Sequence, residues 1–227
     1  MKVAAKSITV AVDETRSVSG LLIVPPDAGA CYVLAHGAGA GMSHPFMEAV
    51  AHGLAEHGIA TLRYQFPYME RGSRRPDSSA LAHATVRAAV AEATRQAPGL
   101  ALIAGGKSFG GRMTSQAQAH APLPDVRGLV FIGFPLHPIG KPSVDRAEHL
   151  FRVGCPMLLL QGTKDKLADM QLLRALHEKL GTSTTLQLFD QANHSFEVPA
   201  RSSLKQVTVM QGLLDATARW IKQVCVL

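Results

Sequence analysis

The chain has 227 residues, of which 47% are hydrophobic and 18% are charged, and its formal net charge is +6. These values exclude a low-complexity chain, and the lack of lysine and arginine runs interleaved with aromatic residues argues against nucleic-acid binding. No apolar run approaches the roughly 20 residues that cross a bilayer, and residues 1–12 contain no signal-peptide core. We expect one α/β domain over residues 1–227, with no nucleic-acid or membrane partner.

Cysteine usage points to a reducing compartment. Cys31, Cys155 and Cys225 are an odd number and lack the short spacings of a disulfide framework or a zinc site. Buried thiols of this kind are typical of a cytoplasmic protein. The sequence indicates no particular oligomeric state.

Strands and helices are expected to alternate along most of the chain. The predicted strands span residues 7–12, 20–24, 31–35, 59–64, 100–104, 127–133, 156–161 and 184–189. The predicted helices span residues 45–57, 79–95, 112–120, 146–152, 171–180 and 204–224. The first two strands are expected to pair antiparallel, and the later ones are apolar enough for buried parallel strands. The pattern predicts a mostly parallel central sheet flanked by helices.

A glycine-rich loop, residues 36–42, follows the strand at 31–35. Such a loop can present fixed backbone N–H groups, and we expect the amide of Ala38 to donate to a developing oxyanion. His36 is expected to hold this loop by a hydrogen bond; His36 and Met42 are also candidates for substrate binding. The alternative is a flexible turn before the next helix.

A long polar loop, residues 65–78, leaves the carboxyl end of the strand at 59–64. Parallel sheets bind ligands at this edge, so Phe66 and Arg71 are substrate-binding candidates. The arginines of the loop can pair with a substrate carboxylate or phosphate. The alternative is a solvated loop whose arginines have no function.

The sequence Gly106-Lys107-Ser108-Phe109-Gly110 fits the G-x-S-x-G pattern between a predicted strand and a predicted helix. That context is the one a nucleophile elbow needs, with the serine hydroxyl raised above the sheet. The amide of Phe109 is then the second expected oxyanion donor. The alternative is an ordinary strand-to-helix turn with a surface serine.

Residues 101–108 also fit A-x-x-x-x-G-K-S, a loose form of the phosphate-binding loop. That loop wraps phosphates with backbone N–H groups and therefore needs a glycine-rich, irregular interior. Here the interior is Leu102, Ile103 and Ala104, which belong in a strand. We therefore reject nucleotide binding.

The remaining candidates also follow predicted strands. Only residues 134–145 separate the strand at 127–133 from the next helix, which leaves no room for a lid domain; Phe134 and His137 are expected to line an open site. Asp165 stands at the end of the strand at 156–161, whereas nearby Asp169 is better suited to cap a helix. His194 follows the last strand. Other histidines lack the spacing of a metal site.

The order Ser108, Asp165, His194 is the order of nucleophile, acid and base on α/β-hydrolase sheets. With the glycine-rich loop and the G-x-S-x-G turn, the whole chain resembles a small α/β-hydrolase of the dienelactone-hydrolase-like kind. True dienelactone hydrolases use a cysteine nucleophile, whereas this chain has Ser108. The resemblance therefore implies a serine hydrolase with a Ser-Asp-His triad acting on a small ester or thioester through an acyl-enzyme, without metal or other cofactor. The alternative function is a catalytically idle binding or scaffold protein.

Overall fold

The computed structural model describes residues 3–226 and is built on one eight-stranded sheet in the order β1-β2-β4-β3-β5-β6-β7-β8. The strands are β1 Lys6–Ala11, β2 Ser17–Ile23, β3 Ala30–Ala35, β4 Ile59–Tyr64, β5 Ala101–Lys107, β6 Val126–Ile132, β7 Met157–Gly162 and β8 Thr184–Phe189. Strand β2 runs antiparallel to β1 and β4, and every pair from β4 to β8 is parallel. The predicted fold class is therefore confirmed.

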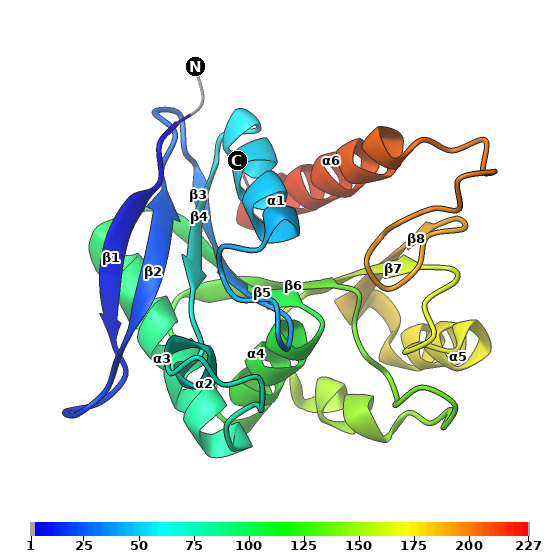
Figure 1. Ribbon diagram of the computed structural model, residues 1–227, viewed down its shortest axis with the longest axis horizontal. Helices are drawn as coiled ribbons and strands as arrows, with labels where there is room; N and C mark the ends of the chain where they lie inside the picture. Colours follow the sequence, from blue (N-terminus) through cyan, green and yellow to red (C-terminus); the bar gives the residue numbers. More distant parts are fainter. Residues whose placement is uncertain (1–2, 227) are drawn as a thin grey trace.

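Helices cover both faces of the sheet. They are α1 Pro45–Glu56, α2 Pro67–Glu70, α3 Ser79–Gln96, α4 Phe109–His120, α5 Met170–Leu180 and α6 Gln206–Cys225, with 3-10 helices η1 Asp145–Arg152 and η2 Gly181–Ser183. Helices α1 and α6 lie on one face, and α3, α4 and α5 lie on the other (Figure 1). None of these helices, within the described residues, is long and apolar enough to cross a membrane.

The two layers follow from the alternation of side chains along the buried strands. In β3, Val33 packs in the cluster that includes α3 and α4, whereas its neighbours Tyr32 and Leu34 pack in the cluster that includes α1 and α6. All six residues of β3 are buried. A strand that is apolar on both faces is stable only between two such layers, which fixes β3 and β5 at the centre.

Two segments near the site differ from the sequence-based expectation. Helix α4 begins at Phe109, directly after Ser108, rather than at residue 112. The loop predicted for residues 65–78 contains the one-turn helix α2, which starts with a proline and is stabilised by a hydrogen bond from the Tyr68 amide to Oδ2 of Asp77 at 2.7 Å. Between β6 and η1 only residues 133–144 intervene, so no lid domain is inserted there, as predicted.

Candidate active site

Ser108 stands at the turn between β5 and α4. Its backbone has φ 49° and ψ −115°, a sparsely populated positive-φ conformation that costs a non-glycine residue roughly 1–3 kcal/mol. The turn is pressed against the end of β3: a Cβ added at Gly106 would lie 2.2 Å from the carbonyl oxygen of Ala35, and one at Gly110 would lie 2.5 Å from that of His36. The glycines on either side of Ser108 are therefore required by this close approach.

The structure brings Ser108, Asp165 and His194 together. Nε2 of His194 lies 2.9 Å from Oγ of Ser108, and Nδ1 lies 2.6 Å from Oδ2 of Asp165. The three residues follow β5, β7 and β8, whose parallel arrangement sets their carboxyl ends on one edge of the sheet. The Asp165 side chain is fully buried, whereas that of His194 is 27% exposed. The imidazole thus connects a buried carboxylate to the hydroxyl of the half-buried Ser108.

Further hydrogen bonds fix the Asp165 carboxylate. Oδ1 accepts from the amide of Leu167 at 2.8 Å, and Oδ2 accepts from Nε2 of Gln161 at 2.5 Å. Asp169 instead caps α5, with its Oδ1 accepting from the first amides of that helix at 2.9 and 3.0 Å. The capping role expected for Asp169 is confirmed.

The glycine-rich loop lies beside Ser108. A Cβ added at Gly37 would lie 3.7 Å from Cβ of Ser108. Phe109 is the first residue of α4, and Ala38 is exposed at the surface of the loop. Within residues 3–226, neither of their amides donates a hydrogen bond to the protein. That these two amides form an oxyanion hole stays a prediction.

His36 holds the glycine-rich loop from inside the protein. Its Nε2 accepts from the amide of Phe66 at 3.0 Å, so Nδ1 carries the hydrogen and donates to the carbonyl oxygen of Gly37 at 2.8 Å. The side chain is completely buried, and burial lowers the pKa of His36 to about 4. The loop-holding role is confirmed, whereas substrate binding by His36 stays a prediction, against which the complete burial of the ring argues.

Burial argues in the same way against three further predictions of substrate binding. Phe66, Phe134 and His137 are 0%, 1% and 3% exposed. Phe66 packs edge-on against Phe109, with ring centroids 5.3 Å apart. Nε2 of His137 accepts from the amide of Asp169 at 2.8 Å. These side chains therefore support the site from below rather than line it.

Met42 and Arg71 remain substrate-binding predictions. The backbone of Met42 is held by Gln65, whose Oε1 accepts from its amide at 2.9 Å, and the side chain is half-buried. The Arg71 guanidinium is exposed and forms an ion pair with Asp77 at 2.6 Å. Its charge is thus already engaged within its own loop.

Sequence reasoning missed two polar side chains at this edge of the sheet. Gln161 holds Asp165, and Nζ of Lys107 donates to the backbone carbonyl of His194 at 2.6 Å. Burial lowers the pKa of Lys107 to about 8, against a smaller opposing effect of the Asp165 carboxylate. Both residues could have been identified in the sequence as polar side chains in the last positions of otherwise apolar strands.

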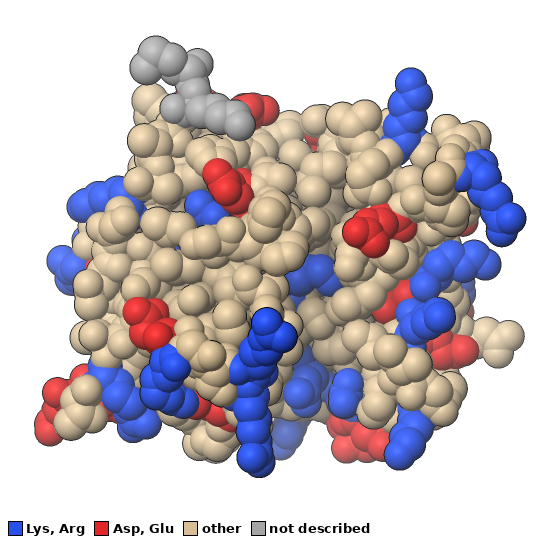
Figure 2. Space-filling view, viewed as in Figure 1, with Lys and Arg blue, Asp and Glu red and all other residues tan. Residues whose placement is uncertain are grey.

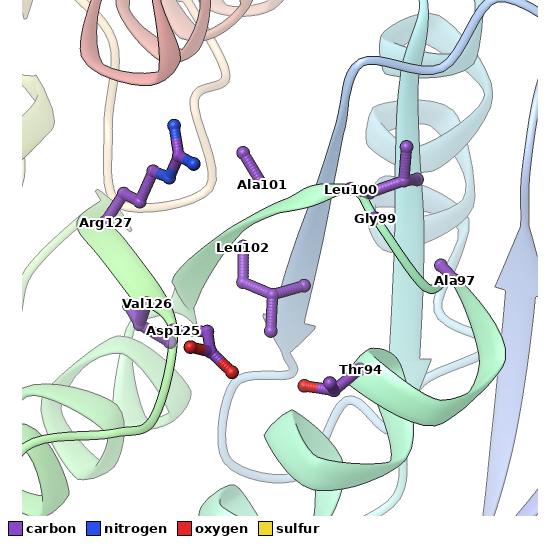
Figure 3. Close-up of a pocket in the computed structure, with 9 residues that line it drawn as sticks. All are labelled: Thr94, Ala97, Gly99, Leu100, Ala101, Leu102, Asp125, Val126 and Arg127. Atoms are coloured by element: carbon purple, nitrogen blue, oxygen red, sulfur yellow. The ribbon is translucent and has the colours of Figure 1, made fainter.

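The surface is hollowed between the part over α1 and the part over β8 and α5, and basic side chains lie in this hollow (Figure 2). A separate depression of about 440 Å³ lies where β5 and β6 begin, between Leu102, Thr94 and Asp125 (Figure 3). The hydroxyl of Thr94 there is bonded to the carbonyl oxygen of Val90 at 3.3 Å. Among the residues that the structure describes, no serine, cysteine or histidine lines that depression, so none of them offers a nucleophile with an adjacent base there.

No group of three or more histidine, cysteine, aspartate or glutamate side chains is arranged to hold a metal ion within residues 3–226. The chemistry that the triad geometry itself can perform is proton transfer from a hydroxyl to an imidazole backed by a carboxylate.

Comparison with known proteins identifies the family. Residues 28–222 match the family described as "Alpha/beta hydrolase domain". The chain belongs to this family. Among solved structures, this alpha/beta hydrolase superposes on a dienelactone hydrolase from Anabaena variabilis with a TM-score of 0.77 and 23% identity, covering 98% of this chain and 99% of that one. The predicted resemblance to dienelactone-hydrolase-like proteins is thereby confirmed.

Two further solved structures have the same fold. One is an α/β serine hydrolase without a lid from Xanthomonas campestris, with a TM-score of 0.72 and 21% identity over 96% of this chain and 95% of that one. The other is the esterase domain of a Rhodothermus marinus protein, with a TM-score of 0.72 and 16% identity over 96% of this chain and 98% of that one. The alpha/beta hydrolase described here thus shares its architecture with these proteins over nearly its whole length.

Proposed function

We propose that this protein is a serine hydrolase that cleaves a small ester or thioester through an acyl-enzyme. The proposal rests on the 2.9 Å contact between Nε2 of His194 and Oγ of Ser108, in a ring whose other nitrogen faces Asp165. A serine hydroxyl is a weak nucleophile until an adjacent base takes its proton. In this proposal Ser108 is the nucleophile, His194 the general base and Asp165 the acid that orients it.

In the first step, Oγ of Ser108 attacks the acyl carbon while its proton passes to Nε2 of His194. Asp165 stabilises the resulting imidazolium. The amides of Ala38 and Phe109 donate to the oxyanion, where removing one donor typically costs about 3 kcal/mol. The imidazolium then returns the proton to the leaving alcohol or thiol as the C–O or C–S bond breaks.

In the second step, His194 takes a proton from water as the water oxygen attacks the acyl carbon. Collapse of that intermediate releases the carboxylic acid and returns the proton to Ser108. Protein groups and water complete each step, so the proposal requires no metal or organic cofactor. A small acyl compound is the proposed substrate, and only residues 133–144 lie between β6 and η1, so no lid domain inserted there covers the site.

The test is intact-mass labelling with a fluorophosphonate, together with hydrolysis of short-chain p-nitrophenyl esters. We expect one adduct on the wild type, none on Ser108→Ala, and loss of ester turnover in that variant. Ser195→Ala is the matched control, because Ser195 is exposed and adjoins the base without contacting Ser108. A wild type that forms no adduct and cleaves no ester contradicts the proposal and favours the binding or scaffold alternative.

A further inference from the structure

Lys107 is the last residue of β5 and directly precedes Ser108. Its Nζ donates to the backbone carbonyl of His194 at 2.6 Å, which is short enough for a charge-assisted hydrogen bond. The same atom lies 5.6 Å from the ring centroid of Phe196 and 6.0 Å from that of Phe46. The ammonium is thus enclosed by two aromatic rings and directed at the main chain of the proposed base.

Gly133, directly after β6, lies close to the Lys107 ammonium as well. Gly133 has φ +69°, and a Cβ added there would lie 3.0 Å from Nζ of Lys107 and 3.5 Å from both Cε1 and Nδ1 of His194. The ammonium and the imidazole therefore both lie close to the backbone of Gly133, whose positive φ favours glycine.

We propose that Lys107 is a positioning residue, whose ammonium ties the backbone of His194 to the end of β5 and so holds Nε2 at proton-transfer distance from Ser108. This inference rests on the proposed function. The imidazole is fixed at Nδ1 by Asp165, and the main chain of the same residue is fixed by Lys107. Two fixed points, rather than one, set the direction of Nε2. A displacement of about 1 Å at a reacting group can cost about a hundredfold in rate.

The strength of this tie depends on the proton of Lys107. The pKa of Lys107 is about 8, so the charged donor is lost at moderately alkaline pH. A neutral amine donates a weaker hydrogen bond than an ammonium does. The titratable groups facing Nζ are the Asp165 carboxylate and the His194 imidazole, whereas α1 contributes Phe46 and the end of β6 contributes Gly133.

The charge of Lys107 also has an opposite effect, because an ammonium repels the imidazolium that forms on His194. If repulsion dominated, replacing Lys107 by a neutral residue would speed the reaction. If positioning dominates, the same replacement slows it. The two effects therefore predict opposite changes in the reaction rate when Lys107 is replaced by a neutral residue.

The experiment measures the inactivation rate constant kinact and the binding constant KI for a fluorophosphonate between pH 6.5 and 9.5. The proteins are the wild type, Lys107→Met, Lys107→Arg and the control Lys164→Met, since Lys164 is exposed on the loop that carries Asp165. We expect kinact of Lys107→Met to be about tenfold to a hundredfold lower with KI unchanged. Wild-type kinact should fall above pH 8 toward that of Lys107→Met. Lys107→Arg, which stays charged, should retain most of the rate and lack this fall.

Several results would overturn the inference. One is a Lys107→Met variant that is labelled as fast as the wild type or faster. Another is a decrease of kinact at alkaline pH in Lys107→Arg that equals the decrease in the wild type. Absence of any label on the wild type would remove the proposed function and this inference together, whereas equal labelling of all four proteins removes the inference alone. If a thermal unfolding scan shows that Lys107→Met is not folded, the inference is still tested by comparing the pH dependence of kinact between Lys107→Arg and the wild type.

Discussion

The side-chain amide of Gln161 donates to Oδ2 of Asp165 at 2.5 Å, and this is the same oxygen that lies 2.6 Å from Nδ1 of His194. Gln161 is completely buried at the end of β7. A carboxylate with one oxygen shared in this way cannot rotate without losing a bond. The orientation of the proposed base therefore depends on a residue that never contacts Ser108.

Replacing Gln161 by leucine should lower kcat about fivefold with KM unchanged, because it removes one hydrogen bond worth about 1 kcal/mol from the carboxylate. The measurement is steady-state hydrolysis of a p-nitrophenyl ester. Gln187→Leu, an exposed position on β8, serves as the matched control and should retain wild-type kcat. Equal kcat values for the two variants would contradict a role of Gln161 in holding Asp165.

Asp165→Asn should reduce kcat by about 10³-fold or more, because an amide neither stabilises the imidazolium nor fixes the required tautomer. Asp169→Asn is the matched control, four residues along the chain. Asparagine caps a helix nearly as well as aspartate, so this variant should keep both its activity and its stability. The measurements are ester hydrolysis and thermal unfolding. A larger activity loss in Asp169→Asn than in Asp165→Asn would reverse the assignment of the acid.

His36 should make stability depend on pH in the acid range. Its pKa is lowered from 6.5 to about 4 in the folded protein, so below pH 6.5 the unfolded chain binds a proton that the folded chain does not. The stabilising contribution of neutral His36 is thus complete above pH 6.5 and is lost as the pH falls toward 4, by at most about 3 kcal/mol.

The measurement is the free energy of unfolding in urea at pH 7, 5.5 and 4.5 for the wild type and His36→Phe. Burial also lowers the pKa of His149 to about 4, and taking the difference between the two proteins removes that shared contribution. The wild type should be more stable than His36→Phe at pH 7, and the difference between their free energies of unfolding should become smaller as the pH falls. A difference that stays constant would show that His36 does not titrate as described.

Two helical glycines should respond in opposite ways to alanine. Gly110→Ala should destabilise the protein by several kcal/mol, since the added Cβ would lie 2.5 Å from the carbonyl oxygen of His36. Gly212→Ala in α6 should stabilise it by up to about 1 kcal/mol, because the nearest atom is Cε1 of Phe189 at 3.5 Å. The measurement is the free energy of unfolding of both variants in urea, compared with that of the wild type. Similar effects at the two positions would mean that the elbow has more space than the distances indicate.

Much of the fold could be predicted because its strands are apolar on both faces. The bounds of β4 and β8 agree with the sequence-based expectation. The bounds of α4 and the existence of α2 were missed, since each depends on contacts from elsewhere in the chain. Helix α4 starts early because the strained turn at Ser108 is held by β3, and α2 is stabilised by Asp77.

The candidate site could be predicted only in part for a similar reason. Ser108, Asp165 and His194 follow parallel strands, so topology alone brings them to one edge. Burial cannot be read from a loop position, and this is why His36, Phe66, Phe134 and His137 were assigned to the surface of the site. The role of Gln161 depends on Asp165, which lies 4 residues away in the loop after β7, and the role of Lys107 depends on His194, 87 residues away. Their polar character within apolar strands was the only local indication.

The position of β8 at the edge of the sheet has a consequence for when the enzyme acquires its proposed activity. In the described part of the chain, strand β8 pairs with β7 alone, and His194 follows β8. During synthesis, a chain that has emerged as far as β7 already contains Ser108, whereas the proposed base, His194, is still to be made. The hydroxyl of Ser108 is thus expected to stay unreactive until the last strand docks and brings His194 to it.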